Sequence, residues 1–564
     1  MKYGVNSIFT KKKCRNTKNV RSVTMKKLLA MLLALVMVLS FAACGTPAEP
    51  EEPSEPEVPT EPEEPTEPEV ELTYAEANAA AIEELKAKYA PSAEAAEAAF
   101  APDVQKAIDD FIATYGGTEN AYVVFDFDNT CSIFDVEEQL AVHQLLTMSF
   151  EIAPENLADV LFTGIGDHDE DRTDLGYGNG SYADWVADIT AAYEYLYTTY
   201  GPFTAAGLTA EEQETVHADP QWAEFATKMR AMYDLVYDAE SPAVAYPWVL
   251  YWFTGMTEQE VYDLAYASHT YYGSVETSKV TWTSPEEIES KVGVVEYGWT
   301  SGTGVSAQVQ ELWKALDEAG IDVWVCSASA TDPIRAAIDA FGLHDYVTGM
   351  IAMTNKVVDG IYVNEYDYET GCGWLDDGNG GWVRDDAPIK AQTQGFGKVE
   401  SINNAIVPKY GCGPLAGFMD STGDWNFCTE YENLKLVICF NRASRKVTDG
   451  GGLASAIALY QRDYLGYDLA TANAAGDTLY VLQGREENGL RSLRNHTATM
   501  LRGAEEEQLL KNDDNYVQLY YIISNEMTTK EAINLFTVKT SADDSVIGIK
   551  YGCVAEYAGY HNIK

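Results

Sequence analysis

An apolar run that ends in two aspartates, AYVVFDFDNTCSIFD at residues 121–135, restricts the fold of this chain more than any other stretch. The β-branched and aromatic residues at 122–125 predict a buried strand. Asp126 and Asp128 lie two positions apart, so both side chains point to the same side of an extended backbone. Two carboxylates this close repel each other, so either one holds a proton or a cation lies between them. The alternative is a strand followed by a solvated acidic turn.

Two later apolar runs also end beside polar residues. DVWVC predicts a strand that ends at Ser327, and PLAGFM predicts a strand that ends just before Asp420 and Asp424. In open α/β sheets, ligands bind beyond the carboxyl ends of parallel strands. We therefore expect these polar residues to meet Asp126 at one edge of a sheet.

Helical patterns separate the predicted strands. Apolar residues at helical spacing predict helices over residues 75–115, 305–316 and 332–342. A further helix carries Lys398 and leads into the strand before Asp420. LKLVICF and DTLYVLQG predict two more strands. This alternation of strand and helix predicts an α/β fold with a parallel sheet.

Four of these segments resemble the signature motifs of the haloacid dehalogenase-like (HAD) hydrolase superfamily. They are DFDNT, the strand ending at Ser327, Lys398 and DSTGD, and the resemblance covers residues 115–135 and 301–500. DFDNT has the DxDxT form of the superfamily's phosphatases. The fourth motif departs from the common GDxxxD pattern, because Met419 replaces its glycine. The resemblance implies a Rossmann-like core, with a parallel sheet and helices on both faces.

The residue types suit phosphoryl transfer by a phosphatase. Asp126 is the expected nucleophile and forms an aspartyl-phosphate. Asp128 is the expected general acid and base, because it can protonate the leaving alcohol and then activate water. We expect Mg²⁺ as the cofactor. Its expected ligands are Asp126, Asp420, Asp424 and the backbone carbonyl of Asp128.

Three further residues are predicted to bind the phosphate. Thr130 and Ser327 offer hydroxyl groups to its oxygens, and Lys398 offers a fixed positive charge. Lys390 is the alternative to Lys398. The spacing from Lys398 to Asp420 suits a helix that leads into the last strand of the site, which favours Lys398.

The chain between the first two motifs is too long for a simple connection, so we expect a mostly helical cap domain at residues 133–300. Capping-box patterns predict helix starts at Thr209–Glu212, Thr257–Glu260 and Ser284–Glu287. The core domain would comprise residues 73–132 and 301–564. Within it, the glycine-rich and aromatic residues 346–390 predict a β-hairpin insert.

The N-terminal region predicts export and anchoring. From Met25, the chain has a basic start, an apolar run and small residues before Cys44, which resembles a bacterial lipoprotein signal peptide. We expect residues 1–44 to be a signal region and Cys44 to carry lipid on the extracytoplasmic face of the cell membrane. In residues 45–72, proline recurs at every third position among glutamates, which predicts an extended tether. A secretory signal or a membrane-spanning anchor is the alternative.

The charge of the chain bears on its partners. The net charge is −50, and the first 44 residues contain nine basic residues and no acidic one. From residue 45 onward, 29 basic and 88 acidic residues leave a net charge of −59. Such a field repels nucleic acid and attracts cationic ligands. We therefore expect no nucleic-acid partner. The resemblance to phosphatases implies a small phosphorylated metabolite as substrate.

The predicted cap is rich in tyrosine and tryptophan, whose rings bind quaternary ammonium groups. The motif order, the large insertion and SAS after the second strand are similar to bacterial phosphorylcholine phosphatases. Phosphocholine or phosphoethanolamine is therefore the expected substrate, with Glu137 and Glu138 as candidate partners of the cation. The alternatives are phosphoserine or a general phosphomonoester, a catalytically impaired solute-binding lipoprotein, and a phosphotransferase or phosphonate-cleaving enzyme.

Overall fold

The computed structural model describes residues 74–91, 96–240, 242–366, 371–443, 450–510, 513–540 and 549–553. Every described residue belongs to one compact unit, residues 70–564, which we call the second unit because residues 1–69 precede it. The predicted signal region 1–44 and tether 45–72 lie outside the described residues. Within the described part, no helix is both long enough and apolar enough to cross a membrane.

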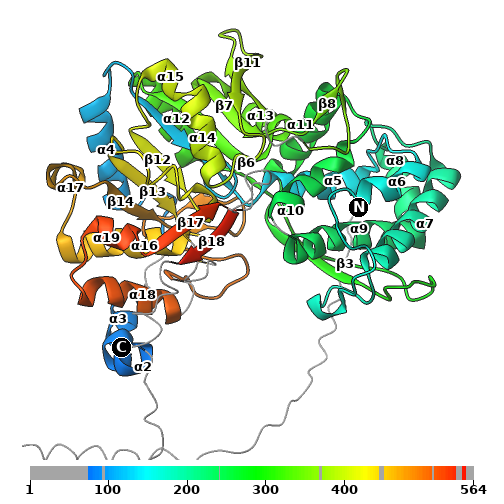
Figure 1. Cartoon of the computed structure of the whole chain (residues 1–564), viewed down its shortest axis with the longest axis horizontal. Helices are drawn as coiled ribbons and strands as arrows, with labels where there is room; N and C mark the ends of the chain where they lie inside the picture. Colours follow the sequence, from blue (N-terminus) through cyan, green and yellow to red (C-terminus); the bar gives the residue numbers. More distant parts are fainter. Residues whose placement is uncertain are drawn as a thin grey trace, which may run out of the picture. The chain divides into compact units, whose positions relative to one another are not determined.

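An eight-stranded sheet forms the framework of the second unit (Figure 1). Its strand order is β11-β10-β7-β6-β1-β12-β13-β14. The strands are β1 (Tyr122–Phe125), β6 (Asp322–Ala330), β7 (Gly349–Met353), β10 (Gly371–Asp376), β11 (Trp382–Ile389), β12 (Ala416–Met419), β13 (Leu436–Phe440) and β14 (Leu479–Gln483). From β7 to β14 the strands run parallel, whereas β10 and β11 pair antiparallel at one edge. The mainly parallel α/β sheet expected from the sequence is confirmed.

Helices cover both faces of this sheet, because successive residues of a buried strand point to opposite sides. Val124 of β1 belongs to the hydrophobic core under α14 and α16, whereas Val123 belongs to the core under α4, α12 and α13. The helices are α3 (Ala79–Lys88), α4 (Pro102–Tyr115), α12 (Ala307–Glu318), α13 (Thr331–Ala340), α14 (Phe396–Ala405), α16 (Gly450–Tyr460), α17 (Leu469–Ala475) and α18 (Asp513–Ser524). Short elements are α15 (Val407–Tyr410), α19 (Thr529–Ile533), β15 (Arg485–Glu486), β16 (Ser492–Leu493), β17 (Phe536–Thr540) and β18 (Ile549–Cys553).

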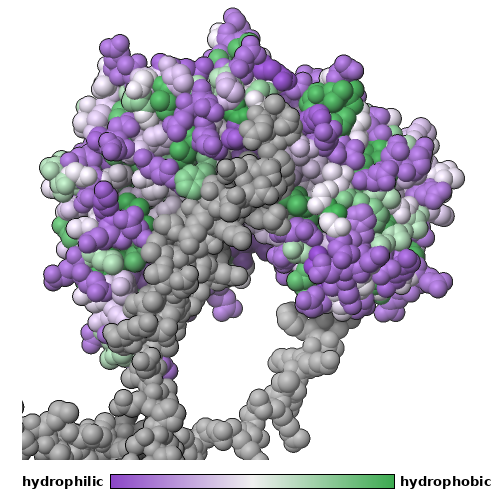
Figure 2. Space-filling model, in the orientation of Figure 1, coloured by the Kyte–Doolittle hydropathy of each residue, from purple (hydrophilic) through white to green (hydrophobic). Residues whose placement is uncertain are grey.

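Hydrophilic residues dominate the face of the molecule in Figure 2, in keeping with the acidic composition.

Two predicted helices differ in extent from the structure. The helix expected over residues 75–115 is divided into α2 (Tyr74–Ala77), α3 and α4. Pro102 stands at the start of α4, because proline fits the first turn of a helix but lacks the N–H that a helix interior requires. The helix expected from residue 305 begins two residues later. Ser306 caps α12, and Val305 belongs to the short strand β5 (Gly304–Val305).

Two strands also differ from the prediction. β6 continues past Ser327 to Ala330, and its pairing with β7 shifts register after Cys326. The predicted insert at residues 346–390 is wrong in part, because it contains β7, a parallel strand of the main sheet. Periodicity alone does not distinguish a short apolar run such as β7 from a segment of a buried helix. The other strands of that range form the hairpins β8–β9 (Val357–Val358 and Ile361–Tyr362) and β10–β11.

Between β2 (Ser132–Ile133) and β5, the chain forms a mainly helical segment, which we call the helical insertion. Its helices are α5 (Val136–Thr147), α6 (Pro154–Leu161), α7 (Tyr182–Tyr200), α8 (Ala210–His217), α9 (Pro220–Ala239), α10 (Pro242–Trp248) and α11 (Glu258–Ser274). A hairpin of β3 (Ser278–Thr283) and β4 (Glu296–Ser301) completes the insertion, which has its own hydrophobic core. Most of its large aromatic residues, such as Trp185 and Trp252, are buried in that core.

The predicted helix starts in the insertion have mixed outcomes. Thr209 and Thr257 form capping boxes at the starts of α8 and α11, as predicted. The third predicted start, at Ser284, is wrong. The Ser284 hydroxyl accepts the backbone N–H of Val295 at 2.8 Å, so it closes the β3–β4 hairpin and does not cap a helix.

Candidate active site

A cavity of about 750 Å³ opens at the carboxyl ends of β1, β6, β12 and β13. This edge of a parallel sheet is where α/β proteins bind ligands. Six of the residues predicted for catalysis, metal binding or phosphate binding line the cavity, and they are Asp126, Asp128, Ser327, Lys398, Asp420 and Asp424. The structure therefore brings together side chains from four distant segments of the sequence.

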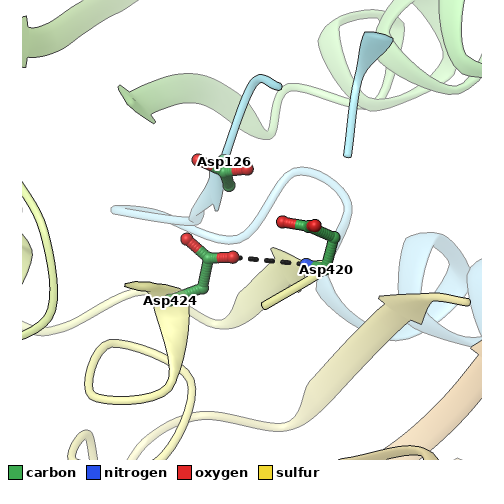
Figure 3. Close-up of side chains that lie close together, drawn as sticks. All are labelled: Asp126, Asp420 and Asp424. Atoms are coloured by element: carbon green, nitrogen blue, oxygen red, sulfur yellow. Dashed lines mark hydrogen bonds between the residues drawn. The ribbon is translucent and has the colours of Figure 1, made fainter. Parts of the chain in front are cut away.

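Asp126, Asp420 and Asp424 form a buried carboxylate cluster (Figure 3). One oxygen from each carboxylate lies within 4.8 Å of the others. Asp126 follows β1 and Asp420 follows β12, and these paired parallel strands carry both side chains to the same edge. Asp424 Oδ2 accepts the backbone N–H of Asp420 at 3.2 Å, which orders the turn between them. Three converging carboxylates fit Mg²⁺, which prefers hard oxygen ligands.

Lys398 of α14 lies among these carboxylates. Its Nζ is 2.6 Å from Asp126 Oδ1 and 2.6 Å from Asp424 Oδ1, and its side chain is 1% exposed. Burial alone would lower the pKa of Lys398, but the two carboxylates raise it well above the usual value. The lysine is therefore a fixed positive charge. The alternative, Lys390, follows β11 and is not among the residues that line the cavity.

Burial and neighbouring charges shift the pKa of Asp126, the candidate nucleophile. Burial and the charge of Asp424 raise the pKa of Asp126 well above its usual value, although Lys398 opposes the shift. Thr130 Oγ1 donates a hydrogen bond to Asp126 Oδ2 at 3.0 Å. Thr130 is buried and does not line the cavity. It therefore orients the Asp126 carboxylate through this hydrogen bond, which differs from its predicted contact with phosphate.

Asp128 lies in a separate set of contacts. Its Oδ1 accepts the backbone N–H of Val136 at 2.7 Å, and its Oδ2 accepts the hydroxyl of Ser329 at 2.6 Å. Burial raises the pKa of Asp128 well above its usual value, and the charge of Asp135 adds to this effect. A carboxyl group that is oriented at both oxygens and favours protonation suits a general acid. Its side chain is outside the three-carboxylate cluster, in keeping with metal binding through the backbone carbonyl only.

Ser327 and Ser329 lie two positions apart on the extended end of β6, and both line the cavity. The backbone N–H of Ser329 donates to Ser327 Oγ at 3.1 Å. Sequence reasoning missed Ser329, although the two-residue spacing used for Asp126 and Asp128 applies equally to SAS. It also missed Arg442, which follows the apolar run of β13 and contacts Asp420 Oδ2 through Nη1 at 3.0 Å.

The helical insertion supplies the opposite wall of the cavity. The acidic and tyrosine side chains that line the cavity from the insertion include Glu138, Asp234, Asp238, Tyr177, Tyr233, Tyr237 and Tyr246. The Tyr177 hydroxyl donates to Asp238 Oδ2 at 2.6 Å, and Tyr237 is 50% exposed. Glu137, in contrast, is 6% exposed, and its Oε2 accepts the backbone N–H of Ala330 at 2.7 Å. Glu137 therefore holds the end of β6 in place, although it also lines the cavity beside Glu138.

Comparisons with known proteins place the fold but not the function. No protein-family model matches the chain, and no curated protein matches it. A conserved protein of unknown function from Anaerococcus prevotii DSM 20548 is 22% identical, covers 72% of this chain and 97% of its own, and has a TM-score of 0.57. Cytosolic 5′-nucleotidase IIIB bound to cytidine is 14% identical over 60% of this chain and 78% of its own, with a TM-score of 0.24. A protein of unknown function from Bordetella pertussis Tohama I is 17% identical over 57% of this chain and 91% of its own, with a TM-score of 0.23. The similarity to the Anaerococcus protein shows a shared fold, and this fold is compatible with the Rossmann-like core expected from the motifs.

Proposed function

We propose that this protein is a Mg²⁺-dependent phosphomonoesterase of the HAD type. The observation that carries the proposal is the buried cluster of Asp126, Asp420 and Asp424 around Lys398, at the carboxyl edge of the parallel sheet. Asp128 lies in the same cavity with both carboxyl oxygens held. Such a set of groups provides a nucleophile, an acid and charge compensation, which are the requirements of phosphoryl transfer.

In the first step, an Asp126 oxygen attacks phosphorus while the bond to the leaving alcohol oxygen breaks, and Asp128 donates its proton to that oxygen. In the second step, Asp128 takes a proton from water as the water oxygen attacks phosphorus and the bond between phosphorus and the Asp126 oxygen breaks. Inorganic phosphate leaves, and both residues return to their starting states. Mg²⁺ bound by the carboxylate cluster and the backbone carbonyl of Asp128 would compensate the negative charge of the phosphoryl oxygens. Lys398 compensates charge on the nucleophile side.

The substrate that fits best is phosphocholine or phosphoethanolamine. The cavity is lined both by the proposed phosphoryl-binding groups and by acids and tyrosines of the helical insertion. Acidic side chains attract a cationic group, and aromatic rings bind a quaternary ammonium through cation–π contact. The acidic residues of the insertion therefore favour a small phosphomonoester that carries a positive charge at the end away from the phosphate. Glu138 would be one contact of that positive charge.

A matched pair of substrates tests this proposal. We expect kcat/KM for phosphocholine to exceed that for 3,3-dimethylbutyl phosphate by about tenfold or more, because the two differ chiefly in the positive charge and a desolvated cation–π contact is worth about 2 kcal/mol. Glu138→Gln should reduce this ratio, and Glu214→Gln, on the exposed side of α8, serves as the control. Equal values for the two substrates would contradict a cation site and favour phosphoserine or a general phosphomonoester.

The role of Ser329 predicts a dependence on the leaving group. Ser329→Ala removes a hydrogen bond that orients Asp128, so kcat/KM for an alkyl phosphate should fall by about 10-fold or more. For 4-nitrophenyl phosphate the fall should be less than about threefold, because nitrophenolate leaves with little need of a proton. Ser329→Thr, which keeps the hydroxyl, is the control. Equal losses on both substrates would show that Ser329 only supports the local structure.

We also propose that the protein is anchored to the extracytoplasmic face of the membrane through lipid on Cys44. The support is the sequence pattern, since these residues lie outside the described part of the structure. Cys44→Ala should abolish incorporation of labelled palmitate and move the protein from the membrane fraction to the soluble fraction. Cys14→Ala, upstream of the lipoprotein signal pattern that begins at Met25, should have no effect. Labelling of Cys44→Ala at the wild-type level would contradict the lipid anchor.

A further inference from the structure

The cavity has far more negative than positive charge. Nine of its lining residues are Asp or Glu, and two, Lys398 and Arg442, are cationic. Lys398 is already shared between Asp126 and Asp424 at 2.6 Å from each. A phosphate group carries up to two negative charges, so a second positive side chain, in addition to Lys398 and the metal ion, would favour its binding in this cavity.

Arg442 has the position and the unused hydrogen-bonding capacity for this role. It follows β13, which pairs with β12, so its side chain enters the cavity from the strand next to Asp420. Its Nη1 lies 3.0 Å from Asp420 Oδ2, and its side chain is 24% exposed. Its Nε is buried and has no hydrogen-bond partner among the described residues. Guanidinium offers five N–H donors in a planar fork that matches phosphate oxygens.

We propose that Arg442 is a phosphate-binding residue, which donates hydrogen bonds to the non-bridging oxygens of the substrate and of the released phosphate. This inference rests on the proposed phosphomonoesterase function. Without a metal ion, Arg442 is paired with Asp420. Mg²⁺ bound at the carboxylate cluster would compensate the negative charge of Asp420. The ion pair between Asp420 and Arg442 would then weaken, so the guanidinium would be available to bind phosphate.

The competing explanation is that Arg442 only orders Asp420 for metal binding. The two explanations predict opposite effects on the metal. If Arg442 binds phosphate, its positive charge competes with Mg²⁺ for Asp420. Removing the Arg442 side chain should then leave the Mg²⁺ affinity unchanged or increase it. If Arg442 orders Asp420, its removal should weaken Mg²⁺ binding.

Isothermal titration calorimetry of the purified protein tests the inference with two probes, Mg²⁺ alone and inorganic phosphate at saturating Mg²⁺. In Arg442→Gln we expect phosphate affinity to fall by about 10- to 100-fold, because a charge-assisted bidentate contact is lost. Mg²⁺ affinity should be equal to that of the wild type or higher. Arg442→Lys keeps the positive charge but not the planar guanidinium, so its phosphate affinity should lie between those of the wild type and Arg442→Gln. It also serves as a second variant if Arg442→Gln does not fold. Arg384→Gln, from an ion pair with Glu258 outside the cavity, is the control.

A phosphate affinity within about threefold of the wild type in Arg442→Gln would overturn the inference, since a charge-assisted contact is worth more than that. Weaker binding of Mg²⁺ would also overturn it, in favour of the ordering role. In either case, a wild-type protein that hydrolyses phosphomonoesters would leave the proposed function intact. A wild-type protein that neither hydrolyses phosphomonoesters nor binds phosphate would instead contradict the proposed function itself.

Discussion

Replacing Asp126 with Asn should lower kcat for a phosphomonoester by on the order of 10⁴-fold or more, as expected for loss of a nucleophile. The amide has the shape of the carboxylate, but it does not attack phosphorus and binds Mg²⁺ poorly. Its effect on folding should be small, because Lys398 keeps its ion pair with Asp424. Turnover by initial-rate assay and circular dichroism of the same sample measure both effects.

The matched control is Asp135→Asn, at another acidic residue that lines the cavity. Asp135 caps α5 by accepting the N–H groups of Glu137 and Glu138, and asparagine is an equally good cap. Its variant should therefore retain most of the activity. Turnover by Asp126→Asn at a rate close to the wild type would exclude Asp126 as the nucleophile and would favour a non-catalytic, solute-binding role for the cavity.

Replacing Lys398 with Met should both abolish turnover and destabilise the protein in the absence of metal. Lys398 is buried, and it separates two carboxylates that are themselves buried. Removal of one partner from a buried ion pair costs about 3–5 kcal/mol, because uncompensated charge remains. Added Mg²⁺ should recover part of this loss, since it binds the same carboxylates.

Urea unfolding in EDTA and in Mg²⁺ measures this effect as a free energy of unfolding. Lys314→Met is the control, because Lys314 forms an ion pair with Glu318 that is 3.7 Å long and has side chains 52% and 66% exposed. Such a partly exposed pair contributes about 1 kcal/mol or less. A free energy of unfolding for Lys398→Met within about 1 kcal/mol of the wild type in EDTA would contradict the electrostatic role of Lys398.

Much of the core could be predicted from sequence because its signals are local. The apolar runs of β1 and β12 and the aspartates that follow them specify both the strands and the edge at which the carboxylates meet. Lys398 could be found because α14 precedes β12 at a spacing typical of an α/β unit. The motif resemblance added the chemistry, which periodicity alone does not supply.

The missed features depend on contacts between distant segments. Ser329 reaches Asp128 only because β6 continues past Ser327, and nothing in DVWVC indicates that extension. Ser284 has the sequence of a helix cap, but its hydroxyl bonds to Val295 across a hairpin. The acids on the wall of the insertion, such as Asp234, lie on helices whose rotation is set by packing, so their direction could not be read from the sequence.

The central claim is that Asp126 carries the phosphoryl group during turnover, and its most direct test is to find that group. The wild type and Asp128→Asn are incubated with 4-nitrophenyl phosphate and Mg²⁺, quenched in acid, digested and measured by mass spectrometry. We expect a phosphoryl group on the peptide that contains Asp126, at a higher level in Asp128→Asn because the second step lacks its base, and none in EDTA. A wild-type protein that turns over this substrate with no phosphoryl group on that peptide in either protein would contradict the account.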